Sequence, residues 1–194
     1  MVANHLHNAD PALISVAFPR PVHFMAKKEA FEVPVLPRIL RMAGAFPVDR
    51  GKADRSAIRR ALLVLEQGVA VGMFPEGTRS LTRSLQRAHA GAGMIAVTAG
   101  VPILPIAITG TERLPLNGAK GKAMAGDPMP EPGHDGVRVL FGETFTILRE
   151  IEGRKVTAAE ATEIIMVEIA RLLPPDFRGV YAETLDDELV RRAR

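Results

Sequence analysis

Short apolar runs alternate with amphipathic stretches along most of the chain. The runs at 69–74, 103–108 and 137–141 have the length of buried strands, whereas 53–67 places its apolar side chains on one face of a helix. Strands that alternate with helices typically pair in one sheet and bury its faces under the helices. The sequence therefore predicts an α/β fold: a single domain with a central, mostly parallel or mixed sheet flanked by helices.

Turn and capping residues predict where the remaining elements begin and end. Asp10 before Pro11 is typical of a helix start, with the Asp side chain as the cap. Thr157 and Glu160 have the spacing of a capping box. Helices are expected at 10–18, 34–42, 91–99 and 157–173, strands at 21–25 and 45–48, and a loop at 116–136.

Neither an internal repeat nor a linker divides the chain of 194 residues. We expect one domain over residues 1–180 and a charged C-terminal tail over 181–194. No apolar run approaches the ~18 residues of a membrane-spanning helix, and no signal peptide is present. The chain contains no cysteine, which excludes disulfides, thiolate catalysis and zinc bound by cysteine.

Nine of the 25 Lys and Arg residues lie within residues 27–60 of this chain, whose net charge is +3. Solvated helix faces explain such a cluster, and so does an anionic partner such as a phosphate, a nucleotide or an acidic lipid. With one Tyr and no Trp, the chain lacks basic residues interleaved with aromatic ones, so we expect no nucleic-acid partner. The cluster consists of Lys27, Lys28, Arg38, Arg41, Arg50, Lys52, Arg55, Arg59 and Arg60.

His5 and Asp10 form the first candidate catalytic pair. His5 is expected just after a short strand, at the edge where open α/β sheets bind ligands. Asp10 starts the next helix, so its carboxylate could accept the Nδ1 proton of His5 and leave Nε2 as a general base. Each residue alone also has a structural explanation, since Asp10 could be a helix cap and His5 a loop histidine.

No protein nucleophile accompanies this pair. The four serines lie outside any G-x-S-x-G elbow, and cysteine is absent. A histidine–carboxylate pair without a nucleophile implies that a substrate supplies the hydroxyl, and hence direct transfer between two bound substrates.

A second group of candidate residues follows the strand expected at 69–74. Arg79 presents a planar fork of donors that suits a phosphate, and the amide of Gly77 could hold a developing oxyanion. Glu76 is expected to orient an arginine or a substrate hydroxyl, and Thr78 is not explained by turn chemistry. Arg50, after the strand at 45–48, is a second candidate for binding phosphate. A simple turn would also explain the segment after residue 74, and a surface ion pair would also explain Arg50.

Four sequence blocks resemble those of the glycerolipid (lysophospholipid) acyltransferase family, whose best-known members are the 1-acylglycerol-3-phosphate acyltransferases. The resemblance implies that His5 deprotonates the acceptor hydroxyl while Asp10 holds His5. It also implies that Arg50, Glu76, Gly77, Thr78 and Arg79 bind the acceptor. The blocks are N-H-x-x-x-x-D at 4–10, G-x-[IF]-x-[VI]-x-R at 44–50, F-P-E-G-T-R-S at 74–80 and V-P-[IV]-[IVL]-P-[VI] at 101–106.

The same resemblance implies the substrates and the cellular location. Acyl-CoA or acyl-carrier protein would be the donor and co-substrate, with no other cofactor and no metal. A lysophosphatidic acid-like acceptor would yield phosphatidic acid. The protein would be cytoplasmic and peripheral on the inner face of the cell membrane, in contact with anionic lipid. The N-terminal membrane-associating element of the family is not evident before residue 4.

Two alternative functions remain open from the sequence. A metal-dependent hydrolase could use His5, His7 and Asp10, although Ala9 and Pro11 occupy positions where such a cluster has ligands. A non-catalytic phospholipid-binding module could use the same arginines, but it would give His5 no task.

Overall fold

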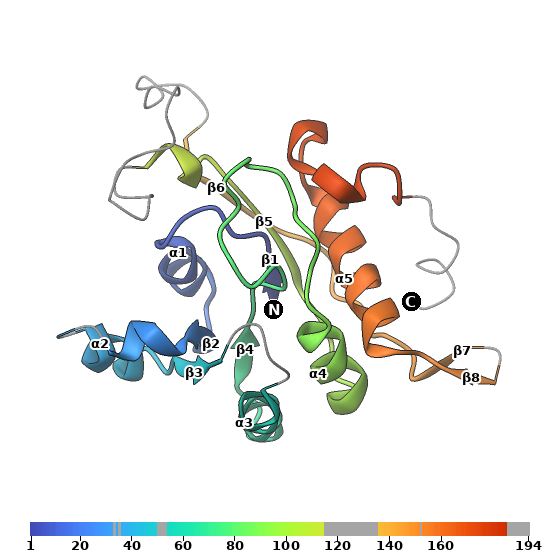
Figure 1. Ribbon diagram of the computed structural model, residues 1–194, viewed down its shortest axis with the longest axis horizontal. Coiled ribbons are helices and arrows are strands. Elements are labelled where there is room, and N and C mark those ends of the chain that lie inside the picture. Colours follow the sequence, from blue (N-terminus) through green and yellow to red (C-terminus); the bar gives the residue numbers. More distant parts are fainter. Residues whose placement is uncertain (33, 35, 50–53, 115–135, 152, 186–194) are drawn as a thin grey trace.

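The computed structural model describes the chain except for residues 33, 35, 50–53, 115–135, 152 and 186–194 (Figure 1). Arg50 and nearly all of the loop expected at 116–136 therefore lie outside the described residues. The elements are β1 (Val2–Ala3), α1 (Asp10–Ala17), β2 (Val22–Lys27), η1 (Lys28–Phe31), α2 (Leu36–Met42), β3 (Phe46–Val48), α3 (Arg55–Glu66), β4 (Ala70–Gly72), α4 (Gly91–Ala99), β5 (Pro105–Thr109), η2 (Thr111–Arg113), β6 (Arg138–Phe141), β7 (Glu150–Ile151), β8 (Arg154–Lys155), α5 (Ala158–Leu172), η3 (Pro175–Phe177) and η4 (Gly179–Tyr181).

The central sheet is mixed, as the sequence predicts. β2 lies between β3 and β4 and is parallel to both, while β5 is parallel to β1 and antiparallel to β6. Ala3 donates its amide to Met73, directly after β4, and Met73 donates to Met1. These bonds join the two halves in the order β6-β5-β1-β4-β2-β3, so the carboxyl ends of β1, β2, β3, β4 and β5 share one edge.

Helices cover both faces of this sheet (Figure 1). Alternate residues of β5 divide between the layers: Ala107 packs in the core cluster that α5 dominates, whereas Ile106 and Ile108 pack with Ile14 of α1. The apolar block at 101–108 is thus core at these positions. Tyr181 is 3% exposed and packs in the α5 cluster, so the ordered core continues past residue 180.

Local signals placed most helices correctly. The capping box of Thr157 and Glu160 is present at the start of α5, and Gly100 ends α4 with a φ of +64°. The prediction that Asp10 caps its helix is wrong, because Ala9 is the N-cap of α1 and no side chain caps that end. The β7–β8 hairpin was missed, since its strands have only two residues each and show no periodicity.

Candidate active site

The segments that follow β1 and β4 meet at the carboxyl edge of the sheet. The amide of His5 donates to Oε1 of Glu76 at 3.1 Å, and the amide of Ser80 donates to the His5 carbonyl at 2.8 Å. On the other side, the Asn4 side chain donates to the carbonyl of Ile108 at 2.8 Å and accepts from its amide at 2.7 Å. The backbone of the His5 loop is therefore fixed by both neighbouring strands.

Asp10 and His5 form a buried pair. Oδ2 of Asp10 lies 2.8 Å from Nδ1 of His5 and also accepts the amides of Leu6 and His7, each at 2.7 Å. Asp10 is fully buried and His5 is 6% exposed. The carboxylate thus points back from the start of α1 into the loop that precedes it. With its proton on Nδ1, the imidazole presents Nε2 as its acceptor.

The imidazole of His5 is also stacked on an aromatic ring. Its centroid lies 4.1 Å from that of Phe74 with an interplanar angle of 19°, and Phe24 stacks behind Phe74 at 5.8 Å. Stacking and the carboxylate together fix both the plane and the rotation of the imidazole. Sequence reasoning missed these rings, because a phenylalanine beside a strand reads as ordinary core.

The carboxylate of Glu76 binds backbone amides of two loops. It is 2% exposed, and its two carboxylate oxygens accept backbone amides, one from His5 and one from Gln86 at 2.9 Å. Burial raises the pKa of Glu76 to about 7, the nearby charge of Asp10 adds to the rise, and the two amides oppose it. Glu76 thus positions the backbone of His5, while the expected contact with an arginine or a substrate hydroxyl stays a prediction.

Gly77 occupies a turn that favours glycine. Its φ is +70°, and a Cβ there would lie 2.8 Å from Cδ2 of His89. Its amide donates to the carbonyl of Phe74 at 2.9 Å. That amide is committed to the turn, which removes the reason for expecting it to hold an oxyanion.

Thr78 and Arg79 lie between Gly77 and Ser80, whose amide donates to the His5 carbonyl. Thr78 is exposed and Arg79 is half-buried. The structure thus brings His5, Asp10, Glu76 and the stretch containing Arg79 to one edge of the sheet, whereas Arg50 lies outside the described residues.

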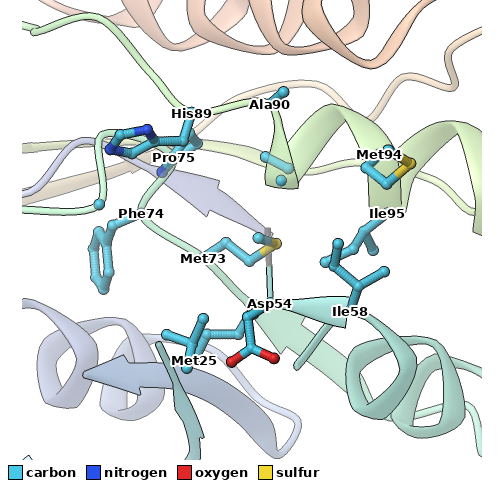
Figure 2. A pocket seen from close by; sticks show the side chains of 14 residues that line it. Met25, Asp54, Ile58, Met73, Phe74, Pro75, His89, Ala90, Met94 and Ile95 are labelled. Carbon is cyan, nitrogen blue, oxygen red and sulfur yellow. The ribbon is translucent and has the colours of Figure 1, made fainter. Parts of the chain in front are cut away.

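An apolar cavity of about 400 Å³ begins beside this segment (Figure 2). Its titratable lining residues are His89, next to Pro75, and Asp54, between Met25 and Ile58. Asp54 caps α3: the amide of Asp49, the Ser56 hydroxyl and the α3 amides hold its pKa down at about 2. The rest of the lining is mainly apolar and comes from β2, β3, α3, α4 and the segment after β4. Such a cavity could not be predicted from the sequence, because no single segment forms it.

The described residues contain no group of three histidine, aspartate or glutamate side chains that could hold a metal ion. Nδ1 of His7 accepts the amide of Ala9 at 3.0 Å, and Asp10 is occupied by His5 and two amides. This arrangement gives no support to a metal-dependent hydrolase built on these three residues. Among the described residues, no helix is both long and apolar enough to cross a bilayer.

The fold and the site define an α/β domain with a histidine–carboxylate pair at the carboxyl ends of parallel strands. Residues 1–109 match the sequence model of the Acyltransferase family. Since that match covers more than half of the chain, the protein belongs to this family.

Named relatives agree with this assignment. The 1-acyl-sn-glycerol-3-phosphate acyltransferase of Bacillus subtilis is 36% identical over 118 residues, which is 57% of this chain and 56% of that protein. The chloroplastic enzyme BAT2 of Brassica napus is 33% identical over 106 residues, 54% of this chain and 31% of its own.

A solved structure is similar as well. The crystal structure of the 1-acyl-sn-glycerophosphate acyltransferase from Thermotoga maritima superposes with a TM-score of 0.58 at 30% identity, covering 75% of this chain and 54% of that one. The chain thus spans about half the length of the proteins that it resembles.

Proposed function

We propose that this protein transfers an acyl group from a thioester to the free hydroxyl of a lysophosphatidic acid-like acceptor, which gives phosphatidic acid. The observation that carries the proposal is the 2.8 Å contact between Nδ1 of His5 and Asp10, buried at the ligand-binding edge of the sheet. The chain has no cysteine and no serine in a nucleophile elbow, so the acceptor hydroxyl is the nucleophile.

The proposed reaction needs one base and no acyl-enzyme. Nε2 of His5 takes the hydroxyl proton as the acceptor oxygen attacks the thioester carbonyl. Asp10 holds the proton on Nδ1 and stabilises the imidazolium that forms. The tetrahedral intermediate collapses to the ester, and the departing thiolate takes the proton back from Nε2. The products are the acylated acceptor and the free thiol, and His5 is neutral again.

The proposed acceptor site uses Arg79 for the phosphate, with Thr78 and the turn at Gly77 beside it. Arg79 adjoins Ser80, whose amide bonds the His5 carbonyl, and this supports a phosphate within reach of the base. The guanidinium geometry suits a phosphate monoester. The names of the relatives, which specify 1-acyl-sn-glycerol-3-phosphate, support the same acceptor. Arg50 is proposed as a second phosphate ligand on the family block alone.

The donor is proposed to be acyl-CoA or acyl-carrier protein. The apolar cavity supports binding of the acyl chain, because it begins at Phe74, on which His5 is stacked. A lipid acceptor and the excess of basic residues support contact with an anionic membrane, at the cytoplasmic side of the cell membrane.

The test is to follow thiol release from acyl-CoA with lysophosphatidic acid, lysophosphatidylcholine or glycerol 3-phosphate as acceptor. We expect turnover with lysophosphatidic acid and a loss on the order of 10² to 10⁴ in kcat for His5→Ala. Arg79→Ala should mainly raise KM for the phosphate-bearing acceptor. A wild-type protein that binds lysophosphatidic acid without releasing thiol would instead support a binding module. Wild-type transfer by His5→Ala would show that another group is the base.

A further inference from the structure

The basic residues of the chain are concentrated in one segment. Residues 27–60 contain nine Lys and Arg against four Asp and Glu, a net charge of +5, whereas the whole chain carries +3 and the remainder therefore −2. This local excess of positive charge gives one part of the surface an attraction for anions.

The fold gathers three of these cations around one groove of about 360 Å³, which we call the basic groove. Lys28 comes from η1, Arg41 from α2 and Arg60 from α3, so the cluster is assembled by tertiary structure rather than by a run of sequence. One carboxylate, Glu32, also lines the groove, together with the apolar side chains of Phe31 and Pro47. None of the three cations forms an ion pair with another described residue.

Apolar surface accompanies the charge. Met42, the last residue of α2 and the neighbour of Arg41, is 83% exposed, and Phe31 is half-buried in the groove. Exposed apolar side chains beside cations suit the interface of an anionic bilayer, where the apolar groups enter the headgroup region and the cations meet lipid phosphates.

We propose that the basic groove and Met42 form the surface by which this protein docks on anionic membranes. The inference rests on the proposed function in one respect: a lysophospholipid acceptor lies in a bilayer. Lys28, Arg41 and Arg60 are all exposed, so each would bind a single soluble phosphate weakly, whereas a bilayer offers many phosphates at once. Lys28 and Phe31 belong to η1, which follows β2 at its carboxyl end, the edge of the sheet that also carries His5.

The test is co-sedimentation of the full chain with vesicles of phosphatidylcholine, alone or with roughly one third phosphatidylglycerol. We expect binding to the anionic vesicles and not to the neutral ones. The triple variant Lys28→Gln, Arg41→Gln, Arg60→Gln should lose on the order of 100-fold in partition coefficient, because each cation contributes about fivefold near an anionic surface. Met42→Ser should weaken binding severalfold without changing the charge.

A matched control removes the same charge elsewhere. Arg138→Gln, Arg149→Gln and Lys155→Gln alter exposed residues outside the segment and should lower binding by less than about threefold. An equal loss in this control, or equal binding to neutral vesicles, would overturn the proposal. So would full displacement from the vesicles by free CoA or by an acyl-carrier protein. If the triple variant does not fold, unchanged binding by Met42→Ser overturns it.

Transfer activity measured in neutral detergent micelles separates the two proposals. The triple variant should keep wild-type turnover there while failing to bind anionic vesicles. A wild-type protein that binds anionic vesicles but transfers no acyl group in micelles would contradict the proposed function and leave the docking surface supported.

Discussion

Replacing Asp10 separates its structural role from its electrostatic one. Its Oδ2 atom accepts three hydrogen bonds, from Nδ1 of His5 and from the amides of Leu6 and His7. The other oxygen, Oδ1, accepts no hydrogen bond from a described residue. Asn has the same shape, so its carbonyl oxygen can take the place of Oδ2 and keep all three bonds. Asp10→Asn therefore removes the charge and places an NH2 group at the buried position of Oδ1, whereas Asp10→Ala removes every bond.

The expected magnitudes differ accordingly. Hydrogen bonds to a buried charged group are worth about 1.5–3 kcal/mol each, and their donors lie in a buried loop, so Asp10→Ala should cost on the order of 5 kcal/mol of unfolding free energy. That is comparable with the whole stability of many domains. Asp10→Asn should cost less, about 1–3 kcal/mol, because the three bonds persist with a neutral acceptor and the cost comes mainly from the buried NH2 group. Its kcat should fall at least ~10²-fold, since the imidazolium loses the charge that stabilises it.

The assay combines urea unfolding with thiol release under saturating donor and acceptor. Asp176→Asn, at an exposed site in η3, is the matched control and should change neither quantity. Wild-type kcat in a folded Asp10→Asn protein would refute the electrostatic role of the carboxylate. Equal destabilisation by Asn and Ala would refute the hydrogen-bond reasoning.

Three further predictions concern the residues around His5 and the capping of α5. Burial raises the pKa of Glu76 from its ordinary value of 4.5 to about 7, so the unfolding free energy should fall by about 3 kcal/mol as pH rises from about 4.5 through 7. Glu76→Gln should remove most of that slope in urea titrations at several pH values. Gly77→Ala should lower the unfolding free energy by about 1–3 kcal/mol, because of the positive φ and the approach of His89. In a His89→Ala background the steric part of this cost should vanish. A double-mutant cycle of unfolding free energies measures that difference. Thr157→Ala should cost about 1 kcal/mol by removing the cap of α5, read as a lower Tm in calorimetry.

The sequence predicts what depends on neighbours along the chain. The ends of α4 and α5 follow from Gly100 and from the capping box, and the contact of His5 with Asp10 follows from a spacing of five residues. The two amides that Glu76 binds could not be predicted, because position 5 comes beside it only when β1 lies next to β4, and position 86 only when the loop after 80 turns back.

Long-range assembly also explains why the apolar cavity could not be predicted. The apolar cavity draws its lining from five separate parts of the chain, whereas the amide of Gly77 is committed by a local turn to the carbonyl of Phe74. A motif can name the residues of such a site, but the hydrogen-bond partners of each residue are fixed only when the strands are placed side by side.

Two carboxylates, those of Asp10 and Glu76, hold the His5 loop, and they differ in what they bind. Asp10 binds the imidazole and two amides through one oxygen, while Glu76 binds the amide of His5 itself. Burial and the charge of Asp10 raise the pKa of Glu76 to about 7. Burial thus favours the neutral form of Glu76, whose carbonyl oxygen can still accept a hydrogen bond from an amide without adding a second negative charge. The charge of the site is then concentrated on the carboxylate that touches the imidazole, where an imidazolium formed in acyl transfer would need it.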